Sequence, residues 1–282
     1  MLSYRHSFHA GSHADVLKHV VEIAILNYLK QKDTPFDYHD THAGAGFYAL
    51  SSKEAKKTGE FENGIGRLYQ HKLPQGLLSQ YVELVRQINP NDKLSLYPGS
   101  PQIAELLRRP QDGLQLTELH PTDFALLKKR FADLPRTRVA EIDAYQGLRA
   151  MLPPLAKRGL VLIDPSYEVK TEYQTLPEGL LPALKRFATG VYAIWYPVIE
   201  RRHTEQFLQT LFATINKDCL RLEFCPFSDG HGVGMTGSGM MVFNPPYTLA
   251  EEMKPVMALL NKHLSMPGHR PRTLIRFHAA EV

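Results

Sequence analysis

The sequence has few cysteines and no long apolar run, and both shortages limit what the chain can be. Only Cys219 and Cys225 occur, and an extended segment of that length spans roughly 20 Å at about 3.3 Å per residue, too far for a disulfide. The longest apolar stretch, residues 20–26, is interrupted by Glu22 and is far shorter than the roughly 18 residues of a membrane span. The opening MLSYRHSFHAGSH is too polar for a signal peptide. We therefore expect reduced thiols, no membrane span and a cytoplasmic location.

Recognisable metal-ligand patterns are also missing, although the chain contains 13 histidines. The spacing of the histidines matches neither HExxH nor the Cys/His patterns of zinc sites, so we predict no metal. The excess of one charge sign is also small, since 33 Lys and Arg against 29 Asp and Glu give a net charge of +4. This small excess permits a polyanionic partner without requiring one.

What is present is an alternation of helical and strand-like segments. Residues 15–30 carry apolar side chains at helical spacing after a capping candidate, Ser12 or His13. Strand-like runs follow at 36–40, 114–118, 138–142, 159–163, 190–195, 220–224 and 239–243. Helical stretches such as 123–131 and 180–187 separate them. The order predicts an α/β domain with a doubly wound, mostly parallel sheet that binds ligands at the carboxyl ends of its strands.

Residues 52–97 interrupt this alternation. They form short, charged helical pieces broken by Gly64, Pro74 and Pro90. We therefore predict one sheet domain made of residues 1–51 and 98–282, with residues 52–97 inserted as a small helical subdomain.

A glycine loop follows the first predicted strand. Gly44, Gly46 and Ala49 satisfy the G-x-G-x-x-G/A pattern, in which glycines let the backbone approach a nucleotide closely. That pattern expects an acidic residue about 20 positions later, and Glu118 reaches this range once residues 52–97 are set aside. Glu118 could also be an ordinary surface acid. The loop suits either a nicotinamide cofactor or S-adenosylmethionine, because both contain adenosine.

A chemical motif ends the strand at 159–163, where GLVLI is followed by Asp164, Pro165, Ser166 and Tyr167. Adenine N6 is a poor nucleophile because its lone pair is delocalised into the ring. A carboxylate and a backbone carbonyl, here of Asp164 and Pro165, could accept the amino hydrogens while Tyr167 stacks on the extruded base. The segment resembles the (D/N/S)-P-P-(Y/F/W) motif of amino-methyltransferases and departs from it at Ser166. The plain alternative is a turn after a strand.

A complete N-P-P-Y also occurs, at residues 244–247 after the apolar run GMMVF. It closes the last predicted strand, far from the first strand in the usual sheet order. Because the position of a site in an α/β sheet follows topology, we interpret it as a structural turn.

Five segments in the same order extend the resemblance over the whole chain: YRHSFHAGSHADVLKH, DTHAGAG, YPGSP, LTELHP and LIDPSY. Together they resemble the bacterial J-type 23S ribosomal RNA adenine-N6 methyltransferase family, also described as proteins for the use of external DNA. The resemblance implies a Rossmann-like fold, S-adenosylmethionine as co-substrate without a metal, and a monomer that methylates N6 of an adenine flipped out of 23S ribosomal RNA.

The resemblance also implies positions for the site. Around the methyl donor it places, with the loop glycines Gly44 and Gly46, the residues Lys18, His19, His42, Ser100, Glu118, Asp143, Ala144 and Asp164. Ala144 stands where the family commonly has glycine. The catalytic set it implies is Tyr4, His6, Lys18, Asp164, Pro165 and Tyr167. Tyr4 and His6 would approach the target base.

Basic residues provide candidates for RNA contact: Lys53, Lys56, Lys57, Arg67, Arg270, Arg272 and Arg276. Such runs are also common on solvated faces. The loop at 229–239 lacks the lysine of a phosphate-binding loop and is interpreted as a mobile loop that contacts substrate.

Two rival functions stay open at this point. A nicotinamide-dependent oxidoreductase would explain the glycine loop but not residues 164–167. A DNA-binding or DNA-utilisation protein fits the second description of the family, although we recognise no carboxylate cluster of a two-metal nuclease.

Overall fold

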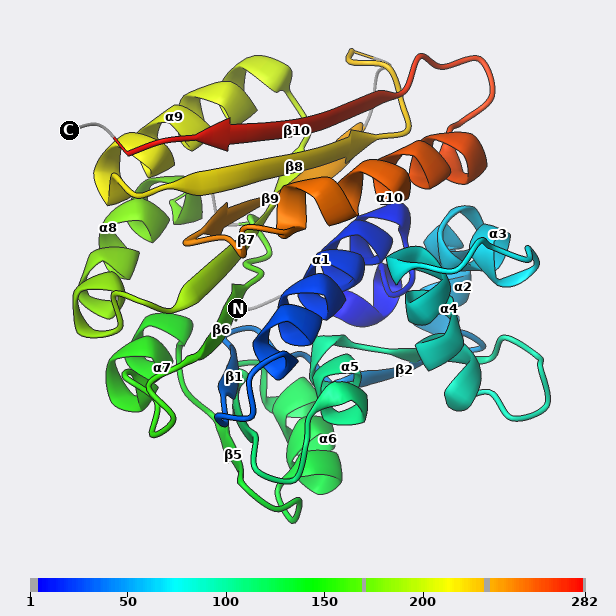
Figure 1. The fold of residues 1–282 in the computed structure, drawn as a ribbon. Coiled ribbons are helices and arrows are strands. Elements are labelled where there is room, and N and C mark those ends of the chain that lie inside the picture. The colour runs from blue at the N-terminus through cyan, green and yellow to red at the C-terminus, as the bar shows by residue number, and fades with distance from the viewer. Residues whose placement is uncertain (1–4, 169–170, 231–233, 281–282) are drawn as a thin grey trace.

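The computed structural model describes residues 5–168, 171–230 and 234–280, which form an α/β domain around an eight-stranded sheet. The strand order is β10-β8-β9-β7-β6-β1-β4-β5, and Figure 1 shows the sheet crossing the molecule. The strands are β1 (Asp37–Asp40), β4 (Gly113–Thr117), β5 (Thr137–Ala140), β6 (Gly159–Ile163), β7 (Val191–Val198), β8 (Cys219–Cys225), β9 (Gly237–Phe243) and β10 (Arg272–His278). The Rossmann-like, mostly parallel sheet predicted from the sequence is confirmed.

Two parts of the sheet differ in strand direction. Neighbours from β5 to β7 pair in parallel, whereas β9 pairs antiparallel with both β7 and β8, and β10 pairs antiparallel with β8. The prediction that the strand at 239–243 is the last one was wrong, because β10 follows it and lies at the sheet edge. The exposed, arginine-bearing pattern of β10 gives little of the apolar alternation by which strands are recognised.

Apolar layers cover both faces of the sheet. On β6, Leu160 and Leu162 belong to one buried cluster, whereas Val161 and Ile163 belong to the other, as the pleat requires. The first cluster includes residues of α1 (His13–Lys30), α4 (Leu77–Gln87), α5 (Ser100–Leu107), α6 (Pro121–Phe131) and α10 (Leu249–Leu264). The second includes residues of α7 (Ala144–Met151), α8 (Glu172–Arg186) and α9 (Arg201–Ile215). Figure 1 shows α7, α8 and α9 together on one side of the sheet.

The segment predicted as an insertion leaves and re-enters the sheet domain at one place. Strands β2 (Phe47–Ala49) and β3 (Leu96–Pro98) pair antiparallel with each other and form a separate two-stranded sheet. Between them lie α2 (Lys53–Thr58), η2 (Glu60–Asn63), α3 (Ile65–Tyr69) and α4. Buried side chains of α3 and α4 join the same apolar cluster as α1. The treatment of 52–97 as a separate subdomain stays a prediction.

Helix α1 is covered on nearly every side. It begins after Ser12, whose side chain accepts a hydrogen bond from the Asp15 amide, and packs against α4, α5, α10, β6 and β9. Figure 1 shows α1 in dark blue beside the orange α10. A helix in this position should be apolar all round, yet Asp15, Lys18, His19 and Glu22 are buried on it. Their spacing places them along one stripe, so α1 carries a buried polar row.

Two sequence expectations on thiols and membranes can be compared with the fold. Cys219 and Cys225 lie at opposite ends of β8, and both are free and buried. Among the residues that the structure describes, no helix is both long and apolar enough to cross a bilayer.

The N-P-P-Y segment and Asp164 lie at opposite ends of the strands of the sheet. Because β9 runs antiparallel to β7, its end at Phe243 pairs with Tyr192 near the start of β7. The Asn244 side-chain amide donates to the carbonyl oxygens of Ala188 at 3.0 Å and Gly190 at 2.7 Å. Asn244 also has a positive φ of 51°, which asparagine tolerates better than most residues. The segment is therefore a structural turn. It lies far from Asp164 because β9 runs antiparallel to β7.

We predict that Asn244→Ala lowers the melting temperature. The substitution removes both side-chain hydrogen bonds and puts alanine, which tolerates positive φ less well than asparagine, at this position, a combined loss of about 1–3 kcal/mol. Thermal unfolding followed by circular dichroism measures the effect. Asn244→Gly is the matched control, because it relieves the backbone and isolates the hydrogen bonds; an Asn244→Ala protein as stable as the wild type contradicts the turn assignment.

A pair of buried acids lies where α1 crosses β1. Glu22 and Asp40 are both fully buried, and the Tyr38 hydroxyl donates to Asp40 Oδ2 at 2.9 Å. Burial, with the neighbouring Asp40 charge, raises the pKa of Glu22 well above its ordinary value. Burial also raises the pKa of Asp40. The folded protein therefore binds a proton at Glu22 more tightly than the unfolded chain does.

We predict that Glu22→Gln stabilises the protein increasingly as pH rises. A group with a raised folded pKa contributes stability below its unfolded pKa and loses it as pH approaches the folded pKa. The melting temperatures of variant and wild type should thus converge near the ordinary glutamate pKa of 4.5 and diverge toward alkaline pH. Glu62→Gln, on an exposed side chain, should show no such divergence; parallel curves for Glu22→Gln and wild type would contradict the prediction.

Candidate active site

A cavity of about 200 Å³ opens at the carboxyl ends of β1, β4, β5 and β6, beside the first turns of α1. Ligands in open α/β sheets bind at the carboxyl ends of the strands. Nine of the residues implied by the sequence resemblance line it: His6, Lys18, His42, Gly44, Ser100, Glu118, Asp143, Ala144 and Asp164. The fold therefore brings together side chains that are far apart along the chain.

Both loop glycines adopt positive φ, 57° at Gly44 and 71° at Gly46. A β-carbon at Gly44 would lie 2.2 Å from the Tyr48 hydroxyl oxygen, and one at Gly46 would lie 2.6 Å from a ring carbon of Phe131. Gly44 keeps the cavity wall thin, whereas Gly46 does not line the cavity and instead lets α6 approach the loop.

Glu118 follows β4 and is fixed by two backbone donors. Its carboxylate accepts hydrogen bonds from the Gly44 amide at 2.8 Å and the His120 amide at 2.7 Å. Burial raises the pKa of Glu118 despite these bonds. Each carboxylate oxygen retains a lone pair, so Glu118 can accept hydroxyl groups of a ligand. Leu119 beside it lines the cavity and is 43% exposed, which offers an apolar surface to a ring.

The remaining polar residues of the first cavity are fixed by hydrogen bonds. Ser100 donates from its hydroxyl to Asp40 Oδ2 at 2.6 Å. The backbone amide of His42 donates to Asp40 Oδ1 at 3.2 Å, and burial lowers the pKa of the His42 side chain to about 4. Asp143 caps α7 by accepting the amides of Tyr145 and Gln146. Ala144 begins that helix, so its backbone does not require the glycine common in the family.

Lys18 connects α1 to the end of β6. Its ammonium nitrogen lies 2.6 Å from Asp164 Oδ2 and 2.8 Å from Asp15 Oδ1, and the Lys18 side chain is only 4% exposed. Burial alone would lower the pKa of Lys18, but the Asp15 and Asp164 carboxylates outweigh burial and raise it well above its ordinary value. Lys18 is therefore a buried cation paired with two carboxylates.

A second cavity of about 420 Å³ adjoins the first and shares four residues with it: His6, Lys18, Asp164 and Ser166. Its other walls include Trp195 and Pro197 of β7, Ile199 after that strand, and Met235. Ile199 is 56% exposed. The second cavity is thus largely apolar, with Asp164 at its junction with the first.

Tyr167 is packed more tightly than a free stacking platform. It has a positive φ of 54° and is 7% exposed. Its hydroxyl donates to the Trp195 carbonyl oxygen at 2.7 Å, and its ring centroid lies 4.6 Å from that of Tyr173. The ring forms part of the wall of the second cavity. Its stacking on a base stays a prediction.

Three other predicted residues do not line either cavity or lie outside the described part. His19 is fully buried and pairs through Nδ1 with the Tyr97 hydroxyl at 2.8 Å. Pro165 is buried and absent from both linings. Tyr4 lies outside the described residues.

Sequence reasoning missed several residues that the fold brings to the site. Asp15, Tyr48 and Trp195 line one cavity or the other. Only Asp15 carried a signal, since it stands one helical turn before Lys18 in the first predicted helix. Within the described part of the chain, no cluster of three or more His, Cys, Asp or Glu side chains could hold a metal ion.

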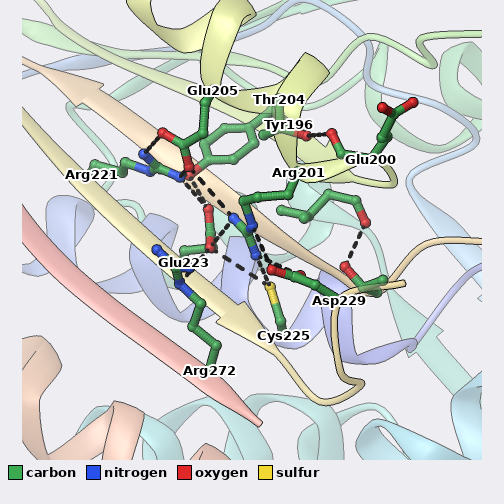
Figure 2. Close-up of polar contacts among 12 residues, drawn as sticks. Tyr196, Glu200, Arg201, Thr204, Glu205, Arg221, Glu223, Cys225, Asp229 and Arg272 are labelled. Atoms are coloured by element: carbon green, nitrogen blue, oxygen red, sulfur yellow. Dashed lines mark hydrogen bonds and ion pairs between the residues drawn. The ribbon is translucent and has the colours of Figure 1, made fainter. Parts of the chain in front are cut away.

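A buried ion network includes Arg201, which is close in sequence to Ile199 in the wall of the second cavity. Figure 2 shows the side chains of this network. Glu223 is fully buried and lies 2.6 Å from both Arg201 Nη1 and Arg221 Nη2. Arg201 also donates to both carboxylate oxygens of Asp229 at 3.0 Å. Because Arg201 begins α9 just after Ile199, the network anchors the chain that forms this wall. Buried charges are tolerable only when paired in this way.

Comparison with known proteins relates the whole chain to one family. The profile described as "Ribosomal RNA large subunit methyltransferase D, RlmJ" matches residues 33–275. Ribosomal RNA large subunit methyltransferase J of Escherichia coli (strain K12) is 50% identical over 268 residues, 95% of this chain and 96% of that protein. The Haemophilus influenzae protein of the same name is 48% identical over 270 residues, 95% of this chain and 96% of that protein.

A solved structure agrees with the fold. A crystal structure of a Legionella pneumophila protein superposes with a TM-score of 0.85 at 40% identity, covering 95% of this chain and 98% of that one. The glycine loop, Glu118 and Asp164 all lie inside the matched range of the family profile.

Proposed function

The chain belongs to the family of ribosomal RNA large subunit methyltransferase J and is an S-adenosylmethionine-dependent methyltransferase; we propose that it methylates N6 of an adenine in 23S ribosomal RNA. The observation that carries this proposal is the pair of adjoining cavities that meet at Asp164. One cavity has the polar floor and glycine loop suited to the donor. The other has apolar walls suited to a base. We further propose that the protein acts as a cytoplasmic monomer.

The first cavity fits the donor in its chemistry. Glu118 would accept the ribose hydroxyls, and Leu119 would contact the adenine ring. Carboxylates of Asp143 and Asp164 lie in the same lining, where they would attract the positive charge of the donor. S-adenosylmethionine supplies an electrophilic methyl group when bound, and no metal is needed for its transfer.

Asp164 would act on the target nitrogen. Its carboxylate reaches both cavities and would accept one N6 hydrogen, while the Pro165 carbonyl oxygen would accept the other. The nitrogen lone pair would then become available, the N–C bond would form as the C–S bond breaks to give the neutral thioether, and the proton lost from N6 would pass to the Asp164 carboxylate. Lys18 holds Asp164 in place, and much of the acceleration comes from such positioning.

The second cavity would hold the flipped adenine. Extrusion of a base costs a few kcal/mol, and stacking on one aromatic ring returns about 1–3 kcal/mol. Trp195 is partly exposed in the wall and adds a stacking candidate to Tyr167. Tyr4 and His6 would approach the base from the N-terminal side.

The lysines of α2 are the strongest candidates for RNA backbone contact. Lys53, Lys56 and Lys57 are exposed, and α2 packs on η1 (His6–Phe8), where the Thr58 hydroxyl donates to the Phe8 carbonyl oxygen. His6 lines the second cavity, so α2 borders the proposed entrance. Arg67 donates instead to the Ser265 carbonyl and to Asn63, and Arg272 lies 3.7 Å from Glu223.

Family membership does not favour the two rival hypotheses, a nicotinamide-dependent oxidoreductase and a DNA-utilisation protein.

We predict micromolar binding of S-adenosylmethionine and S-adenosylhomocysteine, with no measurable binding of NADH. Glu118→Ala should weaken both adenosine ligands about tenfold, because a pair of charge-assisted hydrogen bonds is lost. Isothermal titration calorimetry measures all three ligands. Tighter binding of NADH than of S-adenosylmethionine overturns the functional assignment.

We predict that Asp164→Ala reduces the rate of methyl transfer about 100- to 1,000-fold, since a lost transition-state hydrogen bond typically costs about 3–4 kcal/mol. Single-turnover rates on an adenine-containing hairpin of 23S ribosomal RNA measure the effect. Asn244→Ala, in the N-P-P-Y turn, is the matched control and should retain the wild-type rate. An inactive Asn244→Ala together with an active Asp164→Ala would show that the active site is misplaced.

A further inference from the structure

A continuous chain of contacts between ionisable side chains joins the two cavities. Lys18 lies between Asp164 and Asp15, and the other oxygen of Asp15, Oδ2, lies 2.9 Å from His6 Nε2. The side chains of Lys18 and Asp15 are 4% and 2% exposed. Lys18, Asp164 and His6 line both cavities, and Asp15 lines the second. Asp15 is therefore the one member of the chain to which the methyl-transfer scheme gives no role.

Asp15 also has a structural task that must be separated from any other. As the third residue of α1, it accepts the Gly11 amide on Oδ2 at 2.8 Å. This contact stabilises the helix start and requires only an acceptor oxygen. It does not explain Oδ1, which is directed at the Lys18 ammonium. The capping role uses Oδ2 and the favourable field at the helix start, which leaves the purpose of the pairing between Oδ1 and the Lys18 ammonium to be explained.

The charges around Lys18 give that purpose. Lys18 is a buried cation, and burial would raise the pKa of Asp15, but His6, Lys18 and His19 hold it well below the ordinary value. Both carboxylates beside one ammonium leave an excess of one negative charge among Asp15, Lys18 and Asp164. Without Asp15, Lys18 and Asp164 together would be neutral, and the ammonium would be paired with one carboxylate instead of two. A cationic ligand at the junction would then meet a weaker negative potential.

We propose that Asp15 is a positioning residue that holds Lys18 against Asp164 and gives the junction of the two cavities the negative charge that selects the cationic sulfonium of the methyl donor over its uncharged thioether product. The proposal rests on the proposed function, because it takes the first cavity as the donor site. The partner is defined by its chemistry: a sulfonium beside a buried carboxylate–ammonium–carboxylate group. Asp15 also fixes His6, which lines the second cavity.

The experiment compares two ligands that differ mainly in one methyl group and one positive charge. Dissociation constants of S-adenosylmethionine and S-adenosylhomocysteine are measured by calorimetry on the full-length protein. In Asp15→Asn, an amide oxygen still serves the Gly11 amide, but the charge is removed. We expect the ratio of the two constants to shift about tenfold toward the thioether, as expected for a lost charge interaction in a partly buried site.

Asp112→Asn is the matched control. Asp112 is fully buried, pairs with Arg109 at 2.9 Å and accepts the Phe36 amide at 3.1 Å. It thus shares the burial, ion pair and backbone contact of Asp15 but lies at the amino end of β4, away from both cavities. Asp112→Asn should lower the melting temperature and leave the ratio unchanged.

Lys18→Met tests the opposite sign and should shift the ratio toward the sulfonium ligand, because two carboxylates remain without their cation. An unchanged ratio in a folded Asp15→Asn that binds both ligands overturns the proposal. If Asp15→Asn does not fold, Lys18→Met decides: a shift toward the sulfonium supports the proposal, and no shift overturns it. If the wild type binds neither ligand, the proposed function fails as well. Choice of a wrong RNA target would not alter the ratio.

Discussion

The ammonium group of Lys18, buried between the carboxylates of Asp15 and Asp164, is the contact on which the site depends. It joins the first turns of α1 to the end of β6, 146 residues later in the chain. Removing one partner of a buried pair typically costs about 3–5 kcal/mol, because a charge is left without compensation. The same contact places the proposed acceptor for the N6 hydrogens at the boundary between the two cavities.

This contact accounts for charged side chains on a helix that is otherwise apolar. The helix is covered by the sheet and by α4, α5 and α10, so most of its surface must be apolar. The polar row of Asp15, Lys18, His19 and Glu22 is the exception. Its first two members face the cavities, whereas His19 and Glu22 lie deeper and are buried completely. The raised pKa of Glu22 shows the cost of extending that row into the core.

Strand direction decides at which end of the sheet each motif lies. The parallel strands β1, β4, β5 and β6 end on the same side of the sheet, where Glu118, Asp143 and Asp164 line the first cavity. The antiparallel strand β9 reverses direction, so its end carries Asn244 to the opposite edge, where the side chain ties two carbonyl groups together. Two similar motifs therefore lie in different surroundings, one in a cavity and one in a turn. The buried ion network of Arg201, Arg221 and Glu223 ties the start of α9 to β8.

The sequence alone determined the alternation of strands and helices, the glycine loop with Glu118 as its acidic partner, Asp164 at the end of a strand, and the resemblance to one family. These features are local, because periodicity and short motifs record which face of a segment is buried. Tertiary structure alone decided that β9 lies between β7 and β8, that β10 forms the edge, and that Tyr167 packs against Tyr173. It also brought Asp15 and Trp195 to the cavities. Such facts depend on contacts between distant segments, and a linear pattern carries no record of which segments meet.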